Sequence, residues 1–519
     1  MHTQLHQIVS DMATRRGDAA ALTFKDTTVT YAELWDDALA FANGLRRIDL
    51  QRGERVAVYL DKRIETVVSV LGASAADGVF VPVNPLLRSK QVAYILNDCS
   101  VRVLVTSAER LELLAEELEH CPSVEHVVVL GDLPAAEKAF ALHAWDDCKD
   151  AAAEPVAPEA IDIDMAAILY TSGSTGKPKG VVVSHRNLIT GGASVSQYLG
   201  NHAGDCILAA LPLSFDAGFS QLTTAFTVGA HVVLVNYLLP GDVVRLCAKH
   251  RVTGLTCVPP LWIQLGDQTW PAEATGSLRY FANTGGRMPR ATLDKLRSIF
   301  PNAKPFLMYG LTEAFRSTYL DPAEVDRRPD SIGKAIPNAE ILVVREDGSR
   351  CEPGEEGELV HRGALVAMGY WGDPDRTAER FKPAPGRDPA ICTTETAVFS
   401  GDLVTRDEEG FLYFVGRKDE MIKTSGYRVS PTEIEEVVYS TGMVGDAVAL
   451  GVEDEQLGQS IVLAVSPANG HLEPDELLTE LRQQLPLYMV PKHVVVRPSL
   501  PRSPNGKFDR NLLRQELAA

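Results

Sequence analysis

"MAAILYTSGSTGKPKG", residues 165–180, is the stretch from which the fold and chemistry of this chain are inferred. Its apolar first part, 165–170, predicts a buried strand. The ten residues that follow, 171–180, contain three glycines, four hydroxyl residues and two lysines. Glycines let backbone N–H groups approach a ligand and form an anion-binding nest, while hydroxyls add donors and lysines add positive charge. The stretch therefore predicts a strand that leads into a phosphate-binding loop.

Two other interpretations of the loop fit less well. A flexible Gly/Ser linker gives no reason for two lysines directly after a strand. The P-loop of ATPases needs the pattern G-x-x-x-x-G-K-[ST]. Here Thr171 stands five positions before Gly176, and Pro178 follows Lys177. The Walker pattern is therefore absent.

Outward from this loop, strands and helices alternate. Runs rich in β-branched residues predict strands at 56–60, 78–84 and 101–107. Apolar residues at helical spacing predict helices within 63–76 and 88–99. This alternation indicates a largely parallel sheet covered by helices. The same pattern predicts a second layered unit, with strands at 206–213, 231–236, 254–260 and 304–310.

The sequence pattern changes past about residue 340. There, short strands and Gly/Pro/Glu-rich turns such as 351–363 predict an antiparallel β region. A boundary is predicted near 416–420. Beyond it, Ser430 as N-cap, Pro431 at the first helical position and Glu433 predict a helix that begins with a capping box. Strands at 446–452, 460–466 and 493–498 and a helix over 474–485 complete a compact α+β unit. Residues 149–160 predict a linker or surface loop.

The predicted fold class is therefore α/β. A large N-terminal domain, 1–416, is expected to contain two layered α/β subdomains and a β-rich subdomain. A small, mobile α+β C-terminal domain, 417–519, is expected to follow it.

Composition excludes several classes of function. The net charge of −19 disfavours nucleic acid or an anionic membrane as a partner. The N-terminus lacks the apolar region of a secretion signal, and no apolar run is long enough to cross a membrane. The eight cysteines are scattered without a C-x-x-C pair, so neither a disulfide framework nor a zinc site is indicated. We expect a cytoplasmic enzyme or binding protein.

Five ordered motifs carry a family resemblance. After "YTSGSTGKPKG" come "YGLTE" at 309–313, "FSGD" at 399–402, "GRKDEMIKTSGYRVSPTEIE" at 416–435 and "PNGKFDR" at 504–510. Together they resemble the adenylate-forming superfamily, which includes acyl-CoA synthetases, adenylation domains of nonribosomal peptide synthetases, and luciferase. The resemblance covers essentially the whole chain. It implies that a carboxylate attacks the α-phosphate of Mg-ATP and expels pyrophosphate, after which a thiol expels AMP.

The resemblance also implies a nucleotide site. Tyr309 resembles the residue that stacks on adenine, Thr312 a phosphate ligand and Glu313 the Mg²⁺ ligand, a role that suits a hard oxygen donor. Asp402 resembles the carboxylate that binds the ribose hydroxyls, with Arg417 as its partner. The turn 283–289 would border adenine and the acyl group. The implied ATP-binding residues are Thr171, Ser172, Gly173, Ser174, Thr175, Gly176, Lys177, Lys179, Gly285, Gly286, Tyr309, Gly310, Asp402 and Arg417.

The C-terminal motifs resemble the parts that switch the enzyme between half-reactions. Lys507 resembles the lysine that bridges the substrate carboxylate and phosphate, and Asp419 resembles the hinge about which the domain rotates. Lys423, Gly426 and Arg428 fall where the family forms its thiol-accepting face. Because the chain ends soon after Lys507, we expect the acceptor to be CoA or the phosphopantetheine of a separate carrier protein.

Substrate class depends on "LPLSFDAGF", 211–219. Fatty-acyl and aryl ligases of the superfamily usually read P-L-F-H-x-x-G here, and Phe215 takes the histidine position. Amino-acid-activating members carry F-D-x-S, and their aspartate pairs with the substrate ammonium, as Asp216 would. Asp216 is otherwise a helix N-cap for the segment from Ala217. A general-base role has little to do, because the attacking carboxylate is already ionised.

The amino-acid pocket, carried across by order, gives nine candidate lining residues: Asp216, Ala217, Ser220, Cys257, Ala282, Thr284, Met308, Arg316 and Ser317. Arg316 is the unusual member. It clamps a substrate carboxylate, fills space so that only a small amino acid fits, or pairs with a structural acid such as Asp321.

The leading prediction is a ligase that adenylates an amino acid and transfers it to a phosphopantetheine thiol. An acyl-CoA synthetase for a fatty or aryl acid is the first alternative. A luciferase-like oxygenase and a non-catalytic nucleotide-binding homologue are alternatives of another class.

Overall fold

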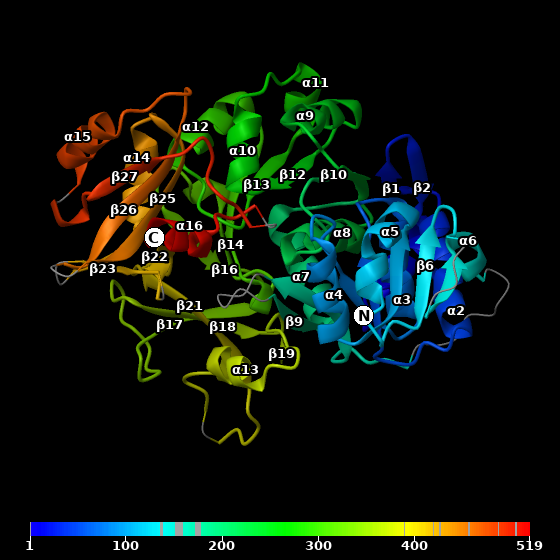
Figure 1. Cartoon of the computed structure of the whole chain (residues 1–519). Helices are drawn as coiled ribbons and strands as arrows, with labels where there is room; N and C mark the ends of the chain where they lie inside the picture. The colour runs from blue at the N-terminus through cyan, green and yellow to red at the C-terminus, as the bar shows by residue number, and fades with distance from the viewer. Residues whose placement is uncertain are drawn as a thin grey trace.

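The computed structural model describes residues 2–134, 139–150, 159–171, 178–388, 390–418, 420–424, 427–454, 457–485, 487–503 and 506–518. Within them the chain forms a large N-terminal α/β domain and a small C-terminal domain (Figure 1). The predicted fold class is confirmed. The expected linker at 149–160 lies mostly outside the described residues.

The first α/β layer is the sheet that carries the phosphate motif. Its strand order is β19-β9-β8-β4-β3-β5-β6-β7. The strands are β3 Arg55–Tyr59, β4 Val79–Pro82, β5 Val101–Ser107, β6 His126–Leu130, β7 Ala141–Ala144, β8 Met165–Thr171, β9 Lys179–Ser184 and β19 Gly369–Tyr370. Neighbours from β8 to β7 pair in parallel, and crossover helices α3 Ile64–Ala75, α4 Ser89–Asp98 and α5 Ala108–Leu118 join them. Runs such as the buried valines of β6 are typical of parallel strands covered on both faces.

The phosphate motif joins two antiparallel strands. The strand predicted at 165–170 is β8, and it pairs antiparallel with β9, so that Thr171 lies opposite Lys179. Residues 172–177 connect the two strands and lie outside the described residues. Thr171 and Lys179 therefore mark the two ends of the motif's loop.

The second layered unit and the β-rich region share one continuous strand path. Its order is β17-β18-β21-β22-β16-β15-β14-β13-β12-β10-β11-β1-β2, with β20 beside β21. Pairing is parallel from β14 to β1 and antiparallel from β14 to β17. The strands are β1 Ala20–Phe24, β2 Thr27–Thr30, β10 Cys206–Ala209, β11 His231–Leu234, β12 Gly254–Cys257, β13 Tyr280–Asn283, β14 Lys304–Tyr309, β15 Thr318–Leu320, β16 Ser331–Ala335, β17 Ala339–Val344, β18 Gly357–Gly363, β20 Phe381–Pro383, β21 Thr396–Arg406 and β22 Leu412–Arg417.

Two helices lie between the two sheets and bury the main core. Helix α7, His185–Leu199, contacts β8 and β9, while α8, Asp216–Val228, contacts β10 and β11, and the two helices pack against each other. Phe80 of the first sheet packs on Phe219 of α8. The remaining helices of this domain are α1 Gln7–Arg16, α2 Tyr31–Arg47, α6 Trp145–Cys148, α9 Pro240–Lys249, α10 Pro259–Gly266, α11 Ala272–Ser277, α12 Arg290–Ile299 and α13 Pro374–Arg380.

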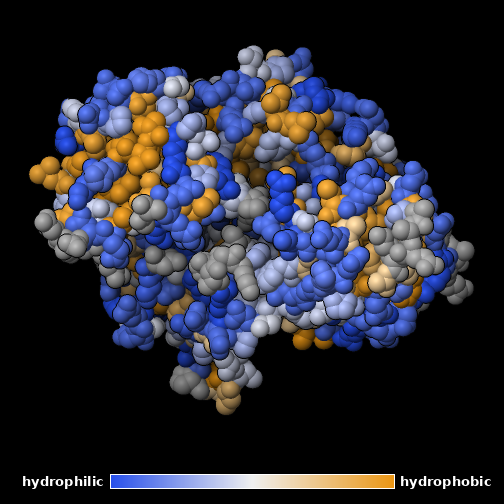
Figure 2. Space-filling view, in the orientation of Figure 1, coloured by the Kyte–Doolittle hydropathy of each residue, from blue (hydrophilic) through white to orange (hydrophobic). Residues whose placement is uncertain are grey.

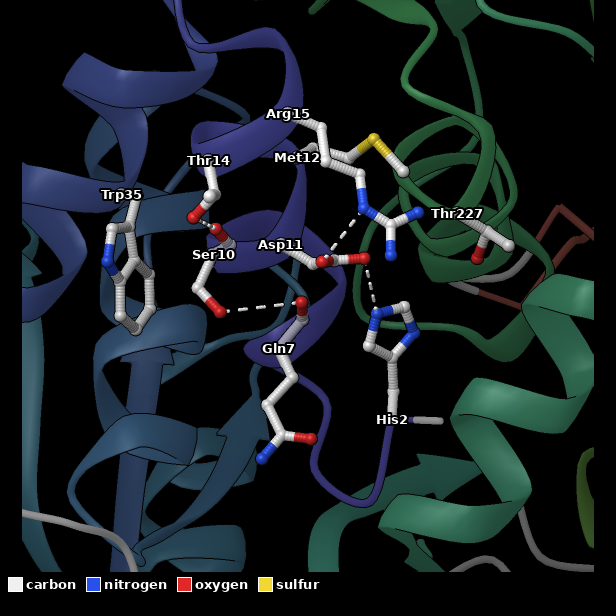
Figure 3. A pocket seen from close by; sticks show the side chains of 9 residues that line it. All are labelled: His2, Gln7, Ser10, Asp11, Met12, Thr14, Arg15, Trp35 and Thr227. Carbon is white, nitrogen blue, oxygen red and sulfur yellow. Dashed lines mark hydrogen bonds and ion pairs between the residues drawn. The ribbon is translucent and has the colours of Figure 1, made fainter.

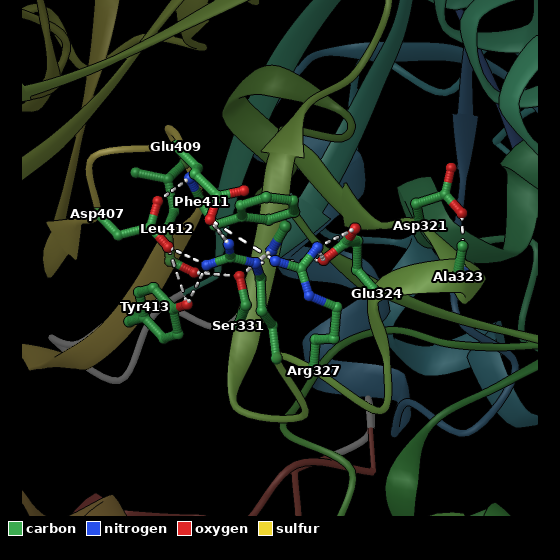
Figure 4. Close-up of polar contacts among 12 residues, drawn as sticks. Asp321, Ala323, Glu324, Arg327, Ser331, Asp407, Glu409, Phe411, Leu412 and Tyr413 are labelled. Atoms are coloured by element: carbon green, nitrogen blue, oxygen red, sulfur yellow. Dashed lines mark hydrogen bonds and ion pairs between the residues drawn. The ribbon is translucent and has the colours of Figure 1, made fainter.

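An arginine cluster fixes the β21–β22 hairpin to the segment that precedes β16. Arg328 forms ion pairs with Glu324, Asp407 and Glu409, and its guanidinium lies 4.1 Å from the ring centre of Phe411. Figure 4 shows these acids converging from the segment before β16 and from the β21–β22 turn. The cluster therefore holds the β21–β22 hairpin, which carries two predicted nucleotide residues, against β16.

The C-terminal domain has its own sheet, ordered β24-β23-β26-β25, with β27 beside β26. Its elements are β23 Ile422–Thr424, β24 Tyr427–Val429, α14 Pro431–Ser440, β25 Val444–Asp454, β26 Gly458–Pro467, α15 Pro474–Gln484, β27 His493–Val496 and α16 Arg510–Ala518. Leu463 of β26 belongs to a core that includes Ile434 of α14 and Leu477 of α15. The small α+β unit predicted beyond residue 420 is present.

The predicted capping box of α14 is wrong. Ser430 is the N-cap residue and Pro431 the first helical residue, but the Ser430 side chain makes no capping hydrogen bond. Its Oγ is buried beside Gly416 of β22 and has no hydrogen-bond partner among the described residues. Contact with the N-terminal domain overrides the local capping preference.

The two domains meet through an ion-pair network. Arg287, in the predicted adenine turn, donates to Asp330 at 2.7 Å and lies 2.6 Å from Glu436 of α14. Arg290 also contacts Asp330. Figure 2 shows a hollow between the C-terminal domain and the first α/β layer, bordered mostly by hydrophilic residues.

Candidate active site

The predicted site residues follow the ends of parallel strands. Asp216 comes after β10, Cys257 ends β12, Thr284 follows β13 and Gly310 follows β14. These strands run parallel, so their carboxyl ends meet at one edge of the second sheet. In open α/β sheets this edge is where ligands bind. The fold thus gathers segments more than ninety residues apart, as the hydrogen bond from Thr312 to Asp216 shows.

Glu313 forms an ion pair with a lysine of the phosphate motif. Lys179 Nζ lies 2.9 Å from Glu313 Oε1, and the Tyr370 hydroxyl donates to the same oxygen at 2.5 Å. Burial raises the pKa of Glu313, but the charge of Lys179 and these hydrogen bonds outweigh it and leave the pKa below its ordinary value. The carboxylate is therefore held ionised, as a magnesium ligand must be.

Tyr370 was not predicted from the sequence. It lies on the two-residue strand β19, which pairs with β9 and so reaches the lysine end of the phosphate motif. Burial and the neighbouring Glu313 raise the pKa of Tyr370 above its usual range, so its hydroxyl stays a donor. No local pattern in the sequence marks this residue.

Asp402 contacts two other residues that are predicted to bind the nucleoside, Tyr309 and Arg417. The Tyr309 hydroxyl donates to Asp402 Oδ2, and Arg417 Nε lies 3.4 Å from Asp402 Oδ1. Asp402 and Arg417 are directly opposite each other in the β21–β22 pair. Burial raises the pKa of Asp402 above its ordinary value, although Arg417, Tyr309 and Lys507 act in the opposite direction. Ser400 accepts from the Asp402 backbone N–H and so fixes its position.

Lys507 reaches this group from the C-terminal domain. Its ammonium is close enough for its charge to act on Asp402. Figure 1 shows the red segment that precedes α16 running from the C-terminal domain toward the centre of the molecule. Arg502 contacts residues on either side of Lys507. It donates to the carbonyl of Gly506, and its guanidinium lies 4.0 Å from the ring centre of Phe508. Sequence reasoning missed Arg502, which lies before the "PNGK" motif.

Asp216 forms a buried ion pair with Arg316. Arg316 Nη1 donates to Asp216 Oδ2 at 3.0 Å, and the Thr312 hydroxyl donates to Oδ1 at 3.1 Å. The Arg316 side chain is 3% exposed and that of Asp216 is 13% exposed. The two residues that sequence reasoning treated separately therefore form one unit beside the "YGLTE" motif.

Two of the sequence interpretations at this point are wrong. Phe215 is the N-cap of α8, and Asp216 is its first helical residue with no capping hydrogen bond, so Asp216 is not the cap. Arg316 does not pair with Asp321, whose carboxylate accepts from the backbone N–H of Ala323. Both errors have the same cause. Asp216 forms a long-range ion pair with Arg316, and no local sequence rule predicts that pair.

Comparison with known proteins adds the family. The model of the AMP-binding enzyme family matches residues 9–371, and that of the AMP-binding enzyme C-terminal domain matches residues 433–507. The chain belongs to the AMP-binding enzyme family. It is an adenylate-forming ligase, as the resemblance of its motifs implied.

Relatives of this AMP-binding enzyme include ligases and peptide antibiotic synthases. A long-chain-fatty-acid–CoA ligase of Salmonella typhimurium is 30% identical, over 99% of this chain and 95% of that protein. Tyrocidine synthase 3 of Brevibacillus parabrevis is 30% identical over 98% of this chain, which matches 8% of that protein. The structure of o-succinylbenzoate CoA synthetase from Bacillus subtilis, in complex with ATP and magnesium ion, gives a TM-score of 0.84 at 27% identity, covering 99% of both chains.

Most of the other predicted pocket residues of this AMP-binding enzyme are small and buried. Cys257, Ala282, Thr284 and Ser220 are buried, while Ala217 is partly exposed beside Asp216. The Ser317 hydroxyl and the buried His361 Nδ1 are 2.9 Å apart. Met308 Sδ lies 2.9 Å from the hydroxyl of Tyr198, which sequence reasoning did not identify.

Several predicted residues cannot be placed. Ser172, Gly173, Ser174, Thr175, Gly176, Lys177, Asp419 and Gly426 lie outside the described residues, as do the side chains of Lys423 and Arg428. Gly285 and Gly286 lie in the turn after β13, beside Val258 and Pro259 respectively.

Two cavities lie away from these residues. One, of about 500 Å³, is lined by α1, by Trp35 of α2 and by Thr227 of α8 (Figure 3). His2 and Arg15 both contact Asp11 at its edge. The other, of about 840 Å³, lies at the start of β14 and includes Tyr198 and Phe306. Neither is lined by a residue predicted from the motifs.

The donor set fits Mg-ATP chemistry. Mg²⁺ is commonly held by one or two carboxylates together with substrate phosphates and water. Glu313 supplies such a carboxylate beside Lys179. Among the described residues no group of three or more His, Cys, Asp or Glu side chains is placed to hold a metal by itself. A search of the same part of the chain for a helix long and apolar enough to cross a membrane found none.

Proposed function

We propose that this enzyme is an AMP-forming acid–CoA ligase for a carboxylic acid that is not an amino acid. It adenylates the acid with release of pyrophosphate and then transfers the acyl group to the thiol of CoA. The observation that carries this proposal is the Asp216–Arg316 ion pair. An aspartate that binds a substrate ammonium must have its charge available, whereas the charge of Asp216 is already balanced by a buried guanidinium. The similarity to a long-chain-fatty-acid–CoA ligase and to o-succinylbenzoate CoA synthetase supports the same choice.

Amino-acid activation is the second candidate. The Phe-Asp pair at 215–216 and the similarity to a tyrocidine synthase favour it. It requires a substrate ammonium to displace Arg316 from Asp216 within a buried site. Removing one partner of a buried pair leaves an uncompensated charge, which commonly costs several kcal/mol. We therefore place the amino-acid prediction second.

In the proposed adenylation site, Lys179 and the 171–177 loop hold the phosphates of ATP. The Thr312 hydroxyl, which donates to Asp216 Oδ1 in the structure, turns to donate to them when ATP binds. Glu313 holds Mg²⁺, which supplies positive charge against the phosphoryl oxygens when bound. Before ATP binds, Lys179 and Tyr370 keep Glu313 ionised and in place. Tyr309 lies beside adenine, and Asp402 with Arg417 holds the ribose. Asp402 Oδ1, which forms an ion pair with Arg417 but accepts no hydrogen bond among the described residues, suits a ribose hydroxyl.

The C-terminal domain supplies the proposed switch. In the adenylation half-reaction the Lys507 ammonium, whose charge acts on Asp402, binds the substrate carboxylate and the phosphate. Thioester formation then uses the face formed by Lys423, Gly426 and Arg428, after rotation at Asp419. We place the domain boundary between residues 416 and 417. Such a rotation has to break the contact between Arg287 and Glu436.

An ATP–pyrophosphate exchange panel tests the proposal. The panel contains fatty, aryl, hydroxy, dicarboxylic and amino acids, and each active acid is then tested for thioester formation with CoA and with a phosphopantetheinylated carrier protein. We expect exchange with non-amino acids and a CoA thioester. Exchange confined to amino acids, with transfer to the carrier only, would overturn it.

A further inference from the structure

Arg316 is a buried cation with unused hydrogen-bonding capacity. An arginine has five N–H donors in a planar fork. In Arg316 the Nη1 atom donates to Asp216 and to the carbonyl of Phe315, at 3.0 and 2.9 Å. The Nε atom is buried and has no acceptor among the described residues. A buried donor without an acceptor is unfavourable, and a bound ligand can supply one.

Asp216 also has capacity left. Each of its oxygens accepts one hydrogen bond, from Thr312 and from Arg316, and an ionised carboxylate offers about four acceptor positions. Its side chain keeps 13% exposure, whereas Arg316 is almost fully covered. The pair therefore presents both an acceptor and a donor, and its formal charges cancel.

The local backbone is shaped to hold this pair. Phe315, directly before Arg316, has a φ of 61°, a left-handed conformation that is unusual for a bulky residue. Its ring lies against Gly191 of α7, where an added Cβ would lie 2.4 Å from the ring. At Gly310, an added Cβ would lie 2.9 Å from the Arg316 Cα. Glycine at both positions makes room for the strained turn that points Arg316 at Asp216.

The pair lies next to the reacting end of the proposed substrate. Thr312, which donates to Asp216, directly precedes Glu313, and Glu313 binds Lys179 of the phosphate motif. The residue that contacts Asp216 is thus the direct chain neighbour of the proposed magnesium ligand, so we place the substrate group that meets the pair near the reacting carboxyl.

The chemistry of the pair excludes several substrate groups. An ammonium only donates, so it competes with Arg316 for Asp216 and leaves Nε without an acceptor. A second carboxylate only accepts and is repelled by Asp216. An alkyl group neither donates nor accepts, so it leaves Arg316 Nε without an acceptor and gives Asp216 no further donor. A hydroxyl or a primary amide both donates and accepts, so it satisfies both at once.

We infer that the substrate acid carries a hydroxyl or primary amide group near its carboxyl, and that Asp216 and Arg316 together select it. This inference rests on the proposed acid–CoA ligase function. It names the substrate class that this function leaves open, and it makes Arg316 a specificity-determining residue.

Matched acids test the inference in pyrophosphate exchange. Butanoate, 2- and 3-hydroxybutanoate, succinamate, 3-aminobutanoate and succinate share a four-carbon frame, and octanoate with 3-hydroxyoctanoate and benzoate with salicylate extend the comparison. In at least one frame we expect kcat/KM of the hydroxy or amide acid to exceed that of the unsubstituted acid by about 10²-fold or more. Equal or higher kcat/KM for the unsubstituted or amino acid in every frame overturns the inference while leaving the ligase function intact. No exchange with any acid overturns both.

A substitution of Arg316 distinguishes a role of the Asp216–Arg316 pair in substrate selection from a role in folding. Arg316→Lys keeps the charge near Asp216 but loses the planar fork. We expect it to lower the ratio of kcat/KM for hydroxy over unsubstituted acid at least tenfold. Arg297→Lys, at an exposed ion pair with Asp326, is the matched control and should leave the ratio unchanged. If Arg316→Lys lowers exchange equally for both acids while Tm is unchanged, the selective role is contradicted.

Discussion

Lys179 Nζ and Glu313 Oε1 lie 2.9 Å apart, so the residue predicted to bind phosphate and the residue predicted to bind magnesium neutralise each other. The pair connects β9 of the first sheet to the turn after β14 of the second. It therefore couples the position of the phosphate loop to that of the metal ligand. Replacing Lys179 should show this coupling directly.

Lys179→Met should raise the pKa of Glu313. Burial favours the neutral acid, and the Lys179 charge is the strongest factor that opposes it. In the intact enzyme the pKa is below its ordinary value, so Glu313 stays ionised throughout the neutral range. In the variant, magnesium-dependent activity should fall off at a higher pH than in the parent. The pH dependence of the Mg²⁺ requirement measures this, and an unchanged midpoint contradicts it.

Lys507→Ala should abolish pyrophosphate exchange but largely spare thioester formation from supplied acyl-adenylate. Loss of one charge-stabilising donor costs on the order of 10²–10³ in rate. Lys492→Ala, at a surface pair with Asp454 in the same domain, is the control for general damage. Equal loss in both half-reactions for the Lys507 variant contradicts the proposed switch.

Glu436→Gln should weaken the contact between the domains. Its partner Arg287 lies in the adenine turn, and the Glu436 side chain is about one-third exposed, so added salt should have a similar effect. We expect exchange to fall several-fold while thioester formation from acyl-adenylate is unchanged or faster. The double exchange Arg287→Glu/Glu436→Arg should restore part of the exchange rate. No recovery in the double variant argues against the ion pair as the cause.

Stability should decrease as the pH falls below about 6.5, in part because of His361. Burial lowers the pKa of His361 to about 3, so the native state keeps this imidazole neutral while the unfolded state binds a proton below about 6.5. Between these values each such group lowers the free energy of unfolding by about 1.4 kcal/mol per pH unit. His361→Asn should flatten the pH dependence of unfolding by about one proton in this window. An unchanged slope contradicts the assignment.

The local parts of the fold were predictable and the long-range pairings were not. Buried valine-rich runs such as 101–107 and amphipathic segments such as 88–99 form the expected strand and helix, because period and composition determine them. The pair Asp216–Arg316 joins residues 100 positions apart, and Tyr370 reaches Glu313 through a two-residue strand. Such contacts depend on how the two sheets pack, which no local pattern encodes.

The capping box at α14 shows how a correct local rule fails. Ser430, Pro431 and Glu433 have the right identities and spacing, and the helix does begin at Pro431. The serine hydroxyl instead turns toward Gly416 at the domain boundary. Tertiary contact therefore decided the side-chain direction while the helix start followed the sequence.

The most direct measurement follows ATP, pyrophosphate, AMP and acyl thioester together for each acid of the panel, in the presence of CoA. We predict that a non-amino acid consumes ATP, releases pyrophosphate and AMP, and gives a CoA thioester, with no such reaction from amino acids. ATP consumption with amino acids alone, without a CoA thioester, would contradict the proposed function and restore Asp216 as an ammonium-binding residue.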